Sequence, residues 1–381
     1  MNHKSECCGC TACQQICPVQ CIVMTSDEEG FLYPKINEGQ CIGCRKCEVV
    51  CPIQSPPLVK GNTQTYVGYA QSEEIRRQSS SGGIFSLAAE YVLKRGGAVF
   101  GAAFDDSLAV HHICVESEED LDKLRGSKYV QSSLENTYAQ AEEYLIDGRW
   151  VLFSGTACQI AGLKNYLGKE YDRLLTIDVL CHGVPSPKIW KLYLEEQERK
   201  YNSKITSIQF RDKKLGWKLF SIRIQFENGR EYAVPFTKDK FMNLFLGDID
   251  LRPSCYDCRF KAFPRPSDMT IGDCWGIEHH LPELDDDLGT SVILVHSAKG
   301  ERLFKAIRER LTVKEAALDS VLPETADSRR SVEMHPNRKQ FWADVQLGQS
   351  IEQISGRIRR NLVQKVLGYL RMKMKRVMKG F

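Results

Sequence analysis

The chain has 381 residues, of which 42% are hydrophobic and 27% charged, a composition typical of a globular protein of two or three domains. The net charge of +3 comes from the end of the chain: residues 350–381 hold nine Lys or Arg and one acidic residue, so the rest carries −5. This distribution argues against nucleic acid as a partner of the whole chain. Residues 1–7 lack the apolar core of a signal peptide, and the longest uncharged apolar stretch, 151–163, is shorter than the ~18 residues that span a membrane. We therefore expect a cytoplasmic protein.

Cysteines dominate the start of the chain: ten of the sixteen lie in the first 51 residues. Because disulfides are rare in the cytoplasm, so many cysteines indicate metal or redox chemistry. Eight of them form two runs of the pattern Cys-x2-Cys-x2-Cys-x3-Cys-Pro, which is typical of bacterial ferredoxins with two 4Fe–4S clusters and in which the fourth cysteine of each run binds the other cluster. The predicted ligands are Cys7, Cys10, Cys13 and Cys51 for one cluster, and Cys41, Cys44, Cys47 and Cys17 for the other.

Residues 1–58 are thus expected to form a small ferredoxin domain. Gly9 and Gly43 stand where the loop must wrap closely around a cluster, which favours a residue without Cβ. Cys8 and Cys21 lie outside the pattern and are expected to be small buried fillers. A pair of structural zinc sites is the alternative, although zinc usually takes two separated Cys-x2-Cys pairs.

The body that follows alternates helical and strand patterns, which predicts an α/β fold (α+β for the whole chain) with a largely parallel core sheet. We divide it into residues 59–145 and 146–330. The second part contains a β-rich insert, with strands expected at 205–210, 219–226 and 232–234 and a hairpin turn at 227–230.

Three segments of the body are candidates for binding an anionic cofactor. Residues 79–83 precede a predicted helix at 84–93, whose N-terminus suits a phosphate; a simple cap formed by Ser81 is the alternative. Residues 125–132 offer two cations, a glycine, hydroxyls and an aromatic ring, with a solvated loop as the alternative. Residues 154–159 form a small-residue turn between a predicted strand and a helix.

Five further cysteines lie in positions that suit ligands. Cys158 and Cys181 follow two predicted strands, and ligands bind at the carboxyl ends of strands in open α/β folds. Cys255 and Cys258 have the spacing of zinc, redox or cluster ligands, and Cys274 comes sixteen residues later.

The sequence also suggests roles for three histidines. His182 is either a proton donor to a substrate or a hydrogen-bonded structural residue. His111 and His112 have no cysteine partner at metal-ligand spacing and are expected to face solvent.

Taken together in their order along the chain, these motifs resemble the beta-subunit family of coenzyme F420-reducing hydrogenase and dehydrogenase. The similarity runs from residue 1 to about 330. The residues that carry it are Ser81-Gly82-Gly83, Arg125-Gly126-Ser127-Lys128-Tyr129, Gly155-Thr156-Ala157-Cys158-Gln159, Cys181-His182-Gly183-Val184-Pro185-Ser186-Pro187, Cys255-Tyr256-Asp257-Cys258 and Ile271-Gly272-Asp273-Cys274-Trp275-Gly276. Ala157 stands where the family often has proline, and Cys274 where an aromatic residue is common.

The resemblance implies FAD, a third 4Fe–4S cluster in the body, and a deazaflavin-type or other two-electron redox substrate. The implied flavin contacts are Ser81, Gly82, Gly83, Arg125, Gly126, Ser127, Lys128, Tyr129, Gly155, Thr156 and Gln159. Five cysteines compete for four ligand positions, since a 4Fe–4S cluster takes four thiolates. We assign Cys158, Cys181, Cys255 and Cys258, with Cys274 as the spare.

The number of electrons that each cofactor carries suggests how the expected clusters and flavin work together. Ferredoxin clusters carry one electron at a time and hydride donors give two, and a flavin converts between them. We therefore expect an iron–sulfur flavoprotein oxidoreductase that exchanges electrons between a small two-electron substrate and a redox partner protein or ferredoxin. One alternative is an electron-transfer subunit without a substrate of its own, which connects a partner enzyme to a ferredoxin pool. Another is a regulatory protein whose clusters sense oxygen.

The last part of the chain, residues 331–381, is expected to be a basic helical tail. Apolar residues recur at helical spacing from Ile351 to Met378 among Lys and Arg residues. Such an amphipathic helix either packs on the body or a partner, or lies on an anionic membrane surface as a peripheral contact.

Overall fold

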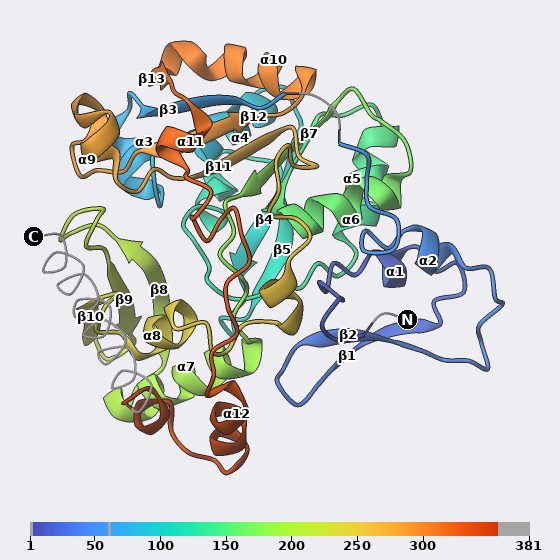
Figure 1. Cartoon of the computed structure of the whole chain (residues 1–381), viewed down its shortest axis with the longest axis vertical. Helices are drawn as coiled ribbons and strands as arrows, with labels where there is room; N and C mark the ends of the chain where they lie inside the picture. The colour runs from blue at the N-terminus through green and yellow to red at the C-terminus, as the bar shows by residue number, and fades with distance from the viewer. Residues whose placement is uncertain (1–2, 60–61, 357–381) are drawn as a thin grey trace, which may run out of the picture.

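A computed structural model describes residues 3–59 and 62–356 of the chain (Figure 1). The expected basic helix lies outside the described residues beyond position 356. Its first turn, residues 351–356, is helical, and Ile351 and Ile354 are buried. No helix in the described part of the chain combines the length and apolarity needed to cross a membrane.

The N-terminal domain consists of two similar halves, drawn in blue beside the body in Figure 1. Helix α1 (Ala12–Gln15) and helix α2 (Lys46–Val49) each follow a residue in the left-handed conformation, Thr11 at φ 57° and Arg45 at φ 57°. Strands β1 (Ile22–Ser26) and β2 (Leu32–Ile36) pair antiparallel. Each cysteine run thus wraps around one short helix in the same way.

The body is built on one mixed sheet of eight strands in the order β13-β3-β12-β11-β7-β6-β4-β5. Its strands are β3 (Gln64–Ala70), β4 (Ala98–Phe104), β5 (Val110–Val115), β6 (Val151–Thr156), β7 (Leu174–Val179), β11 (Met269–Asp273), β12 (Ser291–Val295) and β13 (Leu311–Glu315). The four central strands, β4, β6, β7 and β11, are parallel, and the outer ones are antiparallel to their neighbours. The expectation of a largely parallel sheet is therefore correct only for its centre.

Helices cover both faces of this sheet. On one face, α4 (Ile84–Leu93) and α10 (Ala298–Ile307) pack into an apolar cluster with the strands. On the other, α5 (Thr137–Ile146) and α6 (Ala157–Leu167) do the same. This second cluster also contains Cys10 and Val50 of the N-terminal domain, so the two domains share a core.

The β-rich insert forms a separate three-stranded sheet. Its antiparallel strands are β8 (Ile205–Asp212), β9 (Ser221–Phe226) and β10 (Glu231–Pro235), as the sequence predicted. They pack against α7 (Pro187–Tyr201), α8 (Lys240–Leu246) and α12 (Arg338–Gln346) in a large aromatic cluster. The shorter helices are α3 (Glu73–Gln78), α9 (Ile277–His280), α11 (Leu318–Val321) and the 3-10 turns η1 (Glu119–Lys123), η2 (Pro253–Asp257), η3 (Pro282–Leu284) and η4 (Arg308–Arg310).

Two junctions differ from the sequence expectations. Strand β6 runs to Thr156 and α6 begins at Ala157, so no turn separates them; Thr156 and Gln159 form a capping box instead. Ser81 does not cap α4, because Gly83 occupies that position at φ 85° and the Ser81 hydroxyl donates to the carbonyl of Thr290.

The seam between the two domains is closely packed. A Cβ on Gly162 of α6 would lie 2.9 Å from Cys10 Cβ and 2.9 Å from Tyr138 Oη. Across the same seam, the Arg338 guanidinium donates to the Glu29 carboxylate at 2.6 Å. The N-terminal domain is therefore fixed on the body by both apolar contact and charge.

We predict that Gly162→Val lowers the stability of the folded chain by roughly 1–3 kcal/mol, because the added side chain forces Cys10 away from α6. Anaerobic denaturant unfolding measures this change. Gly39→Val is the control, since a Cβ there would meet only Asn37 Oδ1 at 3.6 Å. Equal stability of the two variants would contradict a tight seam.

Candidate functional site

Cysteines of the two runs lie near one another across the N-terminal domain. Burial raises the pKa of Cys13 to about 12, with Cys7 and Cys51 adding to the rise through their charge. Burial likewise raises the pKa of Cys47, and Cys44 and Cys17 contribute. Cys51 thus lies near Cys7 and Cys13 of the first run, and Cys17 near Cys44 and Cys47 of the second, as the crossed ligand pattern requires; the complete ligand sets stay a prediction. The second run reaches the surface, because Cys41 and Cys44 are exposed.

The two extra cysteines of this domain differ from each other. Cys21 is buried, as expected, with its sulfur 3.5 Å from that of Cys17. Cys8 is not a simple filler: it is half-buried and lines a cavity of the body. Hydrogen bonding to Cys10, opposed by hydrogen bonding to Cys158, raises the pKa of the Cys8 thiol well above its ordinary value.

That cavity, which we call the thiol chamber, has a volume of about 210 Å³. Its cysteines are Cys8, Cys158, Cys181, Cys255 and Cys258. Strands β6 and β7 are parallel neighbours, so the residues that follow them meet at one edge of the sheet, and η2 supplies the other pair. Cys274 lies elsewhere, fully buried in an apolar cluster with Val67 and Trp217.

The charges around the thiol chamber suit an anionic group. Burial raises the pKa of Cys181 to about 12, so as free thiols these cysteines are neutral. Arg265 is paired with Asp178 at 3.0 Å. The Lys261 ammonium donates instead to the carbonyl oxygens of Cys181 at 2.6 Å and His182 at 3.0 Å, and no carboxylate in the described ranges lies at ion-pair distance from it. A cluster with four thiolates would supply the missing negative charge.

A second cavity, of about 660 Å³, lies beside the first, and we call it the flavin cavity after the cofactor that the sequence resemblance implies. All three candidate segments contribute to its wall, and Ser127 N–H donates to Ser80 Oγ at 2.7 Å to join two of them. The predicted contacts that line it are Ser81, Gly83, Arg125, Gly126, Ser127, Lys128, Tyr129, Gly155, Thr156 and Gln159. Gly82 lies behind this wall: its N–H donates to Ser291 Oγ, and a Cβ would lie 2.7 Å from the Gly68 carbonyl oxygen.

Lys128 is the cation of this cavity without a carboxylate partner among the described residues. Its ammonium donates to the carbonyl oxygens of Lys123 at 2.9 Å and Arg125 at 2.8 Å. Burial lowers its pKa to about 7. Arg125, by contrast, already pairs with Asp122. A bound phosphate would give Lys128 the anion that the protein does not provide.

Two family models match most of the body. Both describe the beta subunit of coenzyme F420 hydrogenase/dehydrogenase: the model of its N-terminal part covers residues 65–137, and the model of its C-terminal part covers residues 148–320. The chain belongs to the coenzyme F420 hydrogenase/dehydrogenase beta-subunit family. A third model, a 4Fe-4S dicluster domain, matches residues 6–55. The resemblance seen in the sequence is thus confirmed, and the chain is an iron–sulfur oxidoreductase subunit that transfers electrons.

Solved structures give one comparison of interest. A chain of the F420-reducing nickel–iron hydrogenase complex from Methanosarcina barkeri is 17% identical, with a TM-score of 0.45, over 81% of this chain and 94% of that chain. Comparison with curated proteins gives no match.

Among the residues that line the flavin cavity, Arg211 was not predicted from the sequence, and Asp273 and Trp275 were named only as part of the family motif. Arg211 of β8 donates to Tyr129 Oη at 3.1 Å and pairs with Asp273 at 2.7 Å. Trp275, which is half-exposed, stacks on Trp217 with 4.6 Å between ring centroids. No local sequence pattern marks Arg211 or assigns a role at the cavity to Asp273 and Trp275, because β8 and the segment after β11 meet only in the folded chain.

His112 and His182 also line the flavin cavity. The expectation that His112 faces solvent is wrong: it is buried, its Nε2 donates to the Ser154 carbonyl oxygen at 2.9 Å, and burial lowers its pKa to about 4. His182 is held by Asp248, with 2.6 Å between Nε2 and Oδ1.

The thiol chamber gives a direct prediction for iron content. Three 4Fe–4S clusters would hold about 12 iron atoms per chain, and loss of one leaves about 8. Cys258→Ala should lose the iron of the chamber, whereas Cys274→Ala should keep it because its side chain only packs against apolar residues. Anaerobic iron analysis decides between them, and the opposite pattern would refute the assignment.

Proposed function

We propose that the chain is an iron–sulfur flavoprotein oxidoreductase that binds FAD in the flavin cavity. It exchanges electrons between a small two-electron substrate, of deazaflavin or another type, and the one-electron clusters of the thiol chamber and the N-terminal domain. When bound, a flavin converts between two-electron and one-electron transfer, which clusters alone cannot do.

The observation that carries this proposal is the shared wall of the two cavities. Six residues line both: Thr156, Gln159, Cys181, His182, Gly183 and Val184. A flavin in the larger cavity would therefore be separated from the thiol chamber by a single layer of residues. On the far side, Cys8 brings the N-terminal domain to the same chamber. Flavin cavity, thiol chamber and ferredoxin sites thus follow one another in space.

The residues of the flavin cavity suit two parts of a flavin nucleotide. Hydroxyl groups, backbone N–H groups and Lys128 gather where residues 79–81 meet residues 125–128, and this region suits the phosphates. The other side of the cavity is aromatic, with Phe220, Phe236 and Trp275, and suits planar rings. The large volume leaves this aromatic side as the proposed entry for a planar redox substrate.

The other end of the proposed path lies at the surface of the N-terminal domain. Cys41 and Cys44 are exposed, and Ile42 between them is 64% exposed. Val49 is 70% exposed on the same half of the domain. Exposed apolar side chains beside a cluster site suit contact with a redox partner protein or ferredoxin.

We predict that protein purified without oxygen contains about one FAD per chain and shows flavin bands in addition to cluster absorbance. The measurement is a visible spectrum, with FAD released by acid and quantified. Full iron content without flavin would contradict the proposal and favour an electron-transfer subunit that has no substrate of its own.

We predict that flavin affinity falls as the pH rises from 7 to 9. The pKa of Lys128 is about 7 in the free protein, and a phosphate raises it, so binding takes up a proton above pH 7. Lys128→Gln should weaken binding by about 1.5–3 kcal/mol and remove this pH dependence. Flavin fluorescence titration measures both effects.

The control for this experiment is Lys123→Gln, because the Lys123 side chain is exposed and pairs with Asp120. It should keep the affinity and the pH dependence of the natural protein. If Lys128→Gln behaves in the same way, the phosphate region is misplaced.

A further inference from the structure

Arg252 is an exception among the buried arginines of the described chain. Four are buried: Arg76, Arg211, Arg252 and Arg265. Three are paired with a carboxylate, at 2.6 Å to Asp286, 2.7 Å to Asp273 and 3.0 Å to Asp178. Arg252 is 0% exposed, and no described carboxylate lies at ion-pair distance from it.

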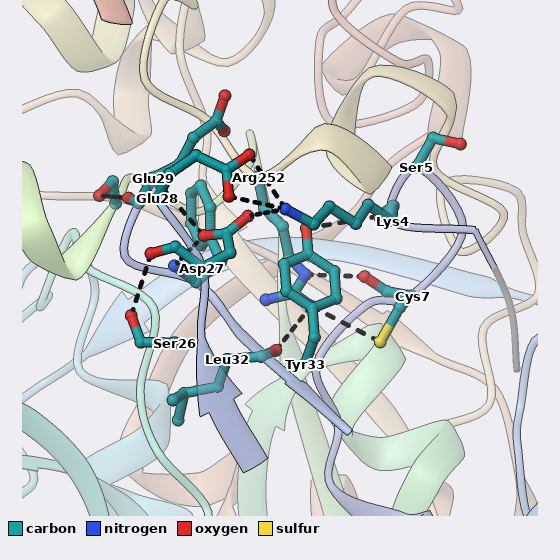
Figure 2. Close-up of polar contacts among 12 residues, drawn as sticks. Lys4, Ser5, Cys7, Ser26, Asp27, Glu28, Glu29, Leu32, Tyr33 and Arg252 are labelled. Atoms are coloured by element: carbon teal, nitrogen blue, oxygen red, sulfur yellow. Dashed lines mark hydrogen bonds and ion pairs between the residues drawn. The ribbon is translucent and has the colours of Figure 1, made fainter. Parts of the chain in front are cut away.

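The partners of Arg252 are neutral groups and one cysteine (Figure 2). Its Nε donates to the Cys7 carbonyl oxygen at 2.7 Å, and Nη2 donates to the Leu32 carbonyl oxygen at 2.9 Å. Nη1 donates to Gln131 Oε1 at 2.9 Å. Nη2 also lies 3.5 Å from Cys7 Sγ, and the guanidinium carbon lies 4.3 Å from the ring centre of Tyr33.

Nearby carboxylates are engaged elsewhere. Lys4 pairs with Asp27 at 3.0 Å and with Glu28 at 2.9 Å, and Figure 2 draws both contacts. Glu29 pairs with Arg338. The acidic side chains of the turn between β1 and β2 thus pair with Lys4 and Arg338, and none of them serves as a counter-ion for Arg252.

The loop of the first cysteine run is shaped to admit the guanidinium. Gly9 has φ +72°, and a Cβ there would lie 2.8 Å from Arg252 Nη1 and 2.6 Å from Gln131 Nε2. A side chain at position 9 would thus displace the guanidinium of Arg252 from the backbone of Cys7. The close approach requires both the glycine and the arginine.

The backbone of Arg252 is hydrogen-bonded to two residues that line the thiol chamber, Val184 and Cys255. Its carbonyl oxygen accepts from the N–H of Cys255 at 2.8 Å, and its own N–H donates to the Val184 carbonyl oxygen at 3.0 Å. One residue therefore connects Cys7 of the ferredoxin domain with Cys255 of the body.

A buried cation without an anion is costly, so a group that carries negative charge belongs beside it. The thiolates of Cys7, Cys10, Cys13 and Cys51 provide that charge when they hold a 4Fe–4S cluster. We propose that Arg252 is the counter-charge of this cluster and raises its reduction potential. The inference rests on the cluster assignment of the proposed function.

The reason is electrostatic. Reduction adds one electron, and hence one negative charge, to the group bound by Cys7 without making or breaking a bond. A fixed positive charge and an N–H donor at the Cys7 sulfur stabilise the more negative state. The guanidinium thereby favours transfer of an electron from the chamber side to the ferredoxin domain.

The test is a redox titration of the full chain without oxygen, with dithionite as reductant and the clusters followed by electron paramagnetic resonance. Arg252→Gln should lower the potential of one cluster by at least a tenfold change in equilibrium constant, about 59 mV for one electron. Arg252→Lys keeps the charge and should restore most of the potential. Arg338→Gln is the control, because it removes a seam arginine that is paired with Glu29 and bonded to no cysteine.

An unchanged potential in Arg252→Gln at full iron content would overturn the proposal, as would an equal shift in Arg338→Gln. If Arg252→Gln binds less iron, Arg252→Lys becomes the deciding variant. Iron content and potential equal to those of the natural protein would support the charge effect, and loss of either would refute it. Cys7→Ala distinguishes failure of the Arg252 proposal from failure of the cluster assignment, because full iron content in that variant would overturn the cluster assignment itself.

Discussion

Positive charge that is buried or half-buried, with no carboxylate partner among the described residues, is the constraint on which the candidate site depends. Lys261 at the thiol chamber donates only to carbonyl oxygens, and Lys128 at the flavin cavity does the same. Such cations are costly in a protein interior unless an anion accompanies them. Each stands beside a cavity, whereas Arg76, Arg211 and Arg265 are neutralised by the protein itself. We therefore propose that anionic cofactors neutralise these two lysines when they are bound.

The parallel centre of the sheet determines where these cavities form. Strands β6 and β7 end side by side, so Thr156, Cys158 and Cys181 meet at one edge. The N-terminal domain covers that edge, with α1 in contact with α6. The β-rich insert closes the other side through Arg211 and Phe220. The proposed electron path would therefore need only short steps between three packed units.

Local spacing accounts for what the sequence predicted well. The two cysteine runs, the strand ends before Cys158 and Cys181, and the strands of the insert all follow from patterns within a few residues. The antiparallel outer strands and the direct β6–α6 junction could not be predicted from such local patterns, because strand pairing and capping depend on distant contacts. The placement of Gly82 against Gly68, and of His112 in the interior, was likewise hidden because both depend on packing against other strands.

The cations at the site were hidden for the same reason. Arg252 and Cys7 are separated by 245 residues and meet only through the fold. Arg211 contacts Tyr129 across 82 residues. A single arginine or lysine carries no signal in a sequence with 52 of them, and its role appears only when burial and the absence of a described carboxylate partner are seen together.

In the proposed function, one chain joins a two-electron carrier to three one-electron carriers. The most direct measurement is the number of electrons that the natural protein takes up in an anaerobic reductive titration. We expect about five electron equivalents per chain, two with bleaching of flavin absorbance and three with bleaching of cluster absorbance. Uptake of about three equivalents or fewer, with no flavin contribution, would contradict it.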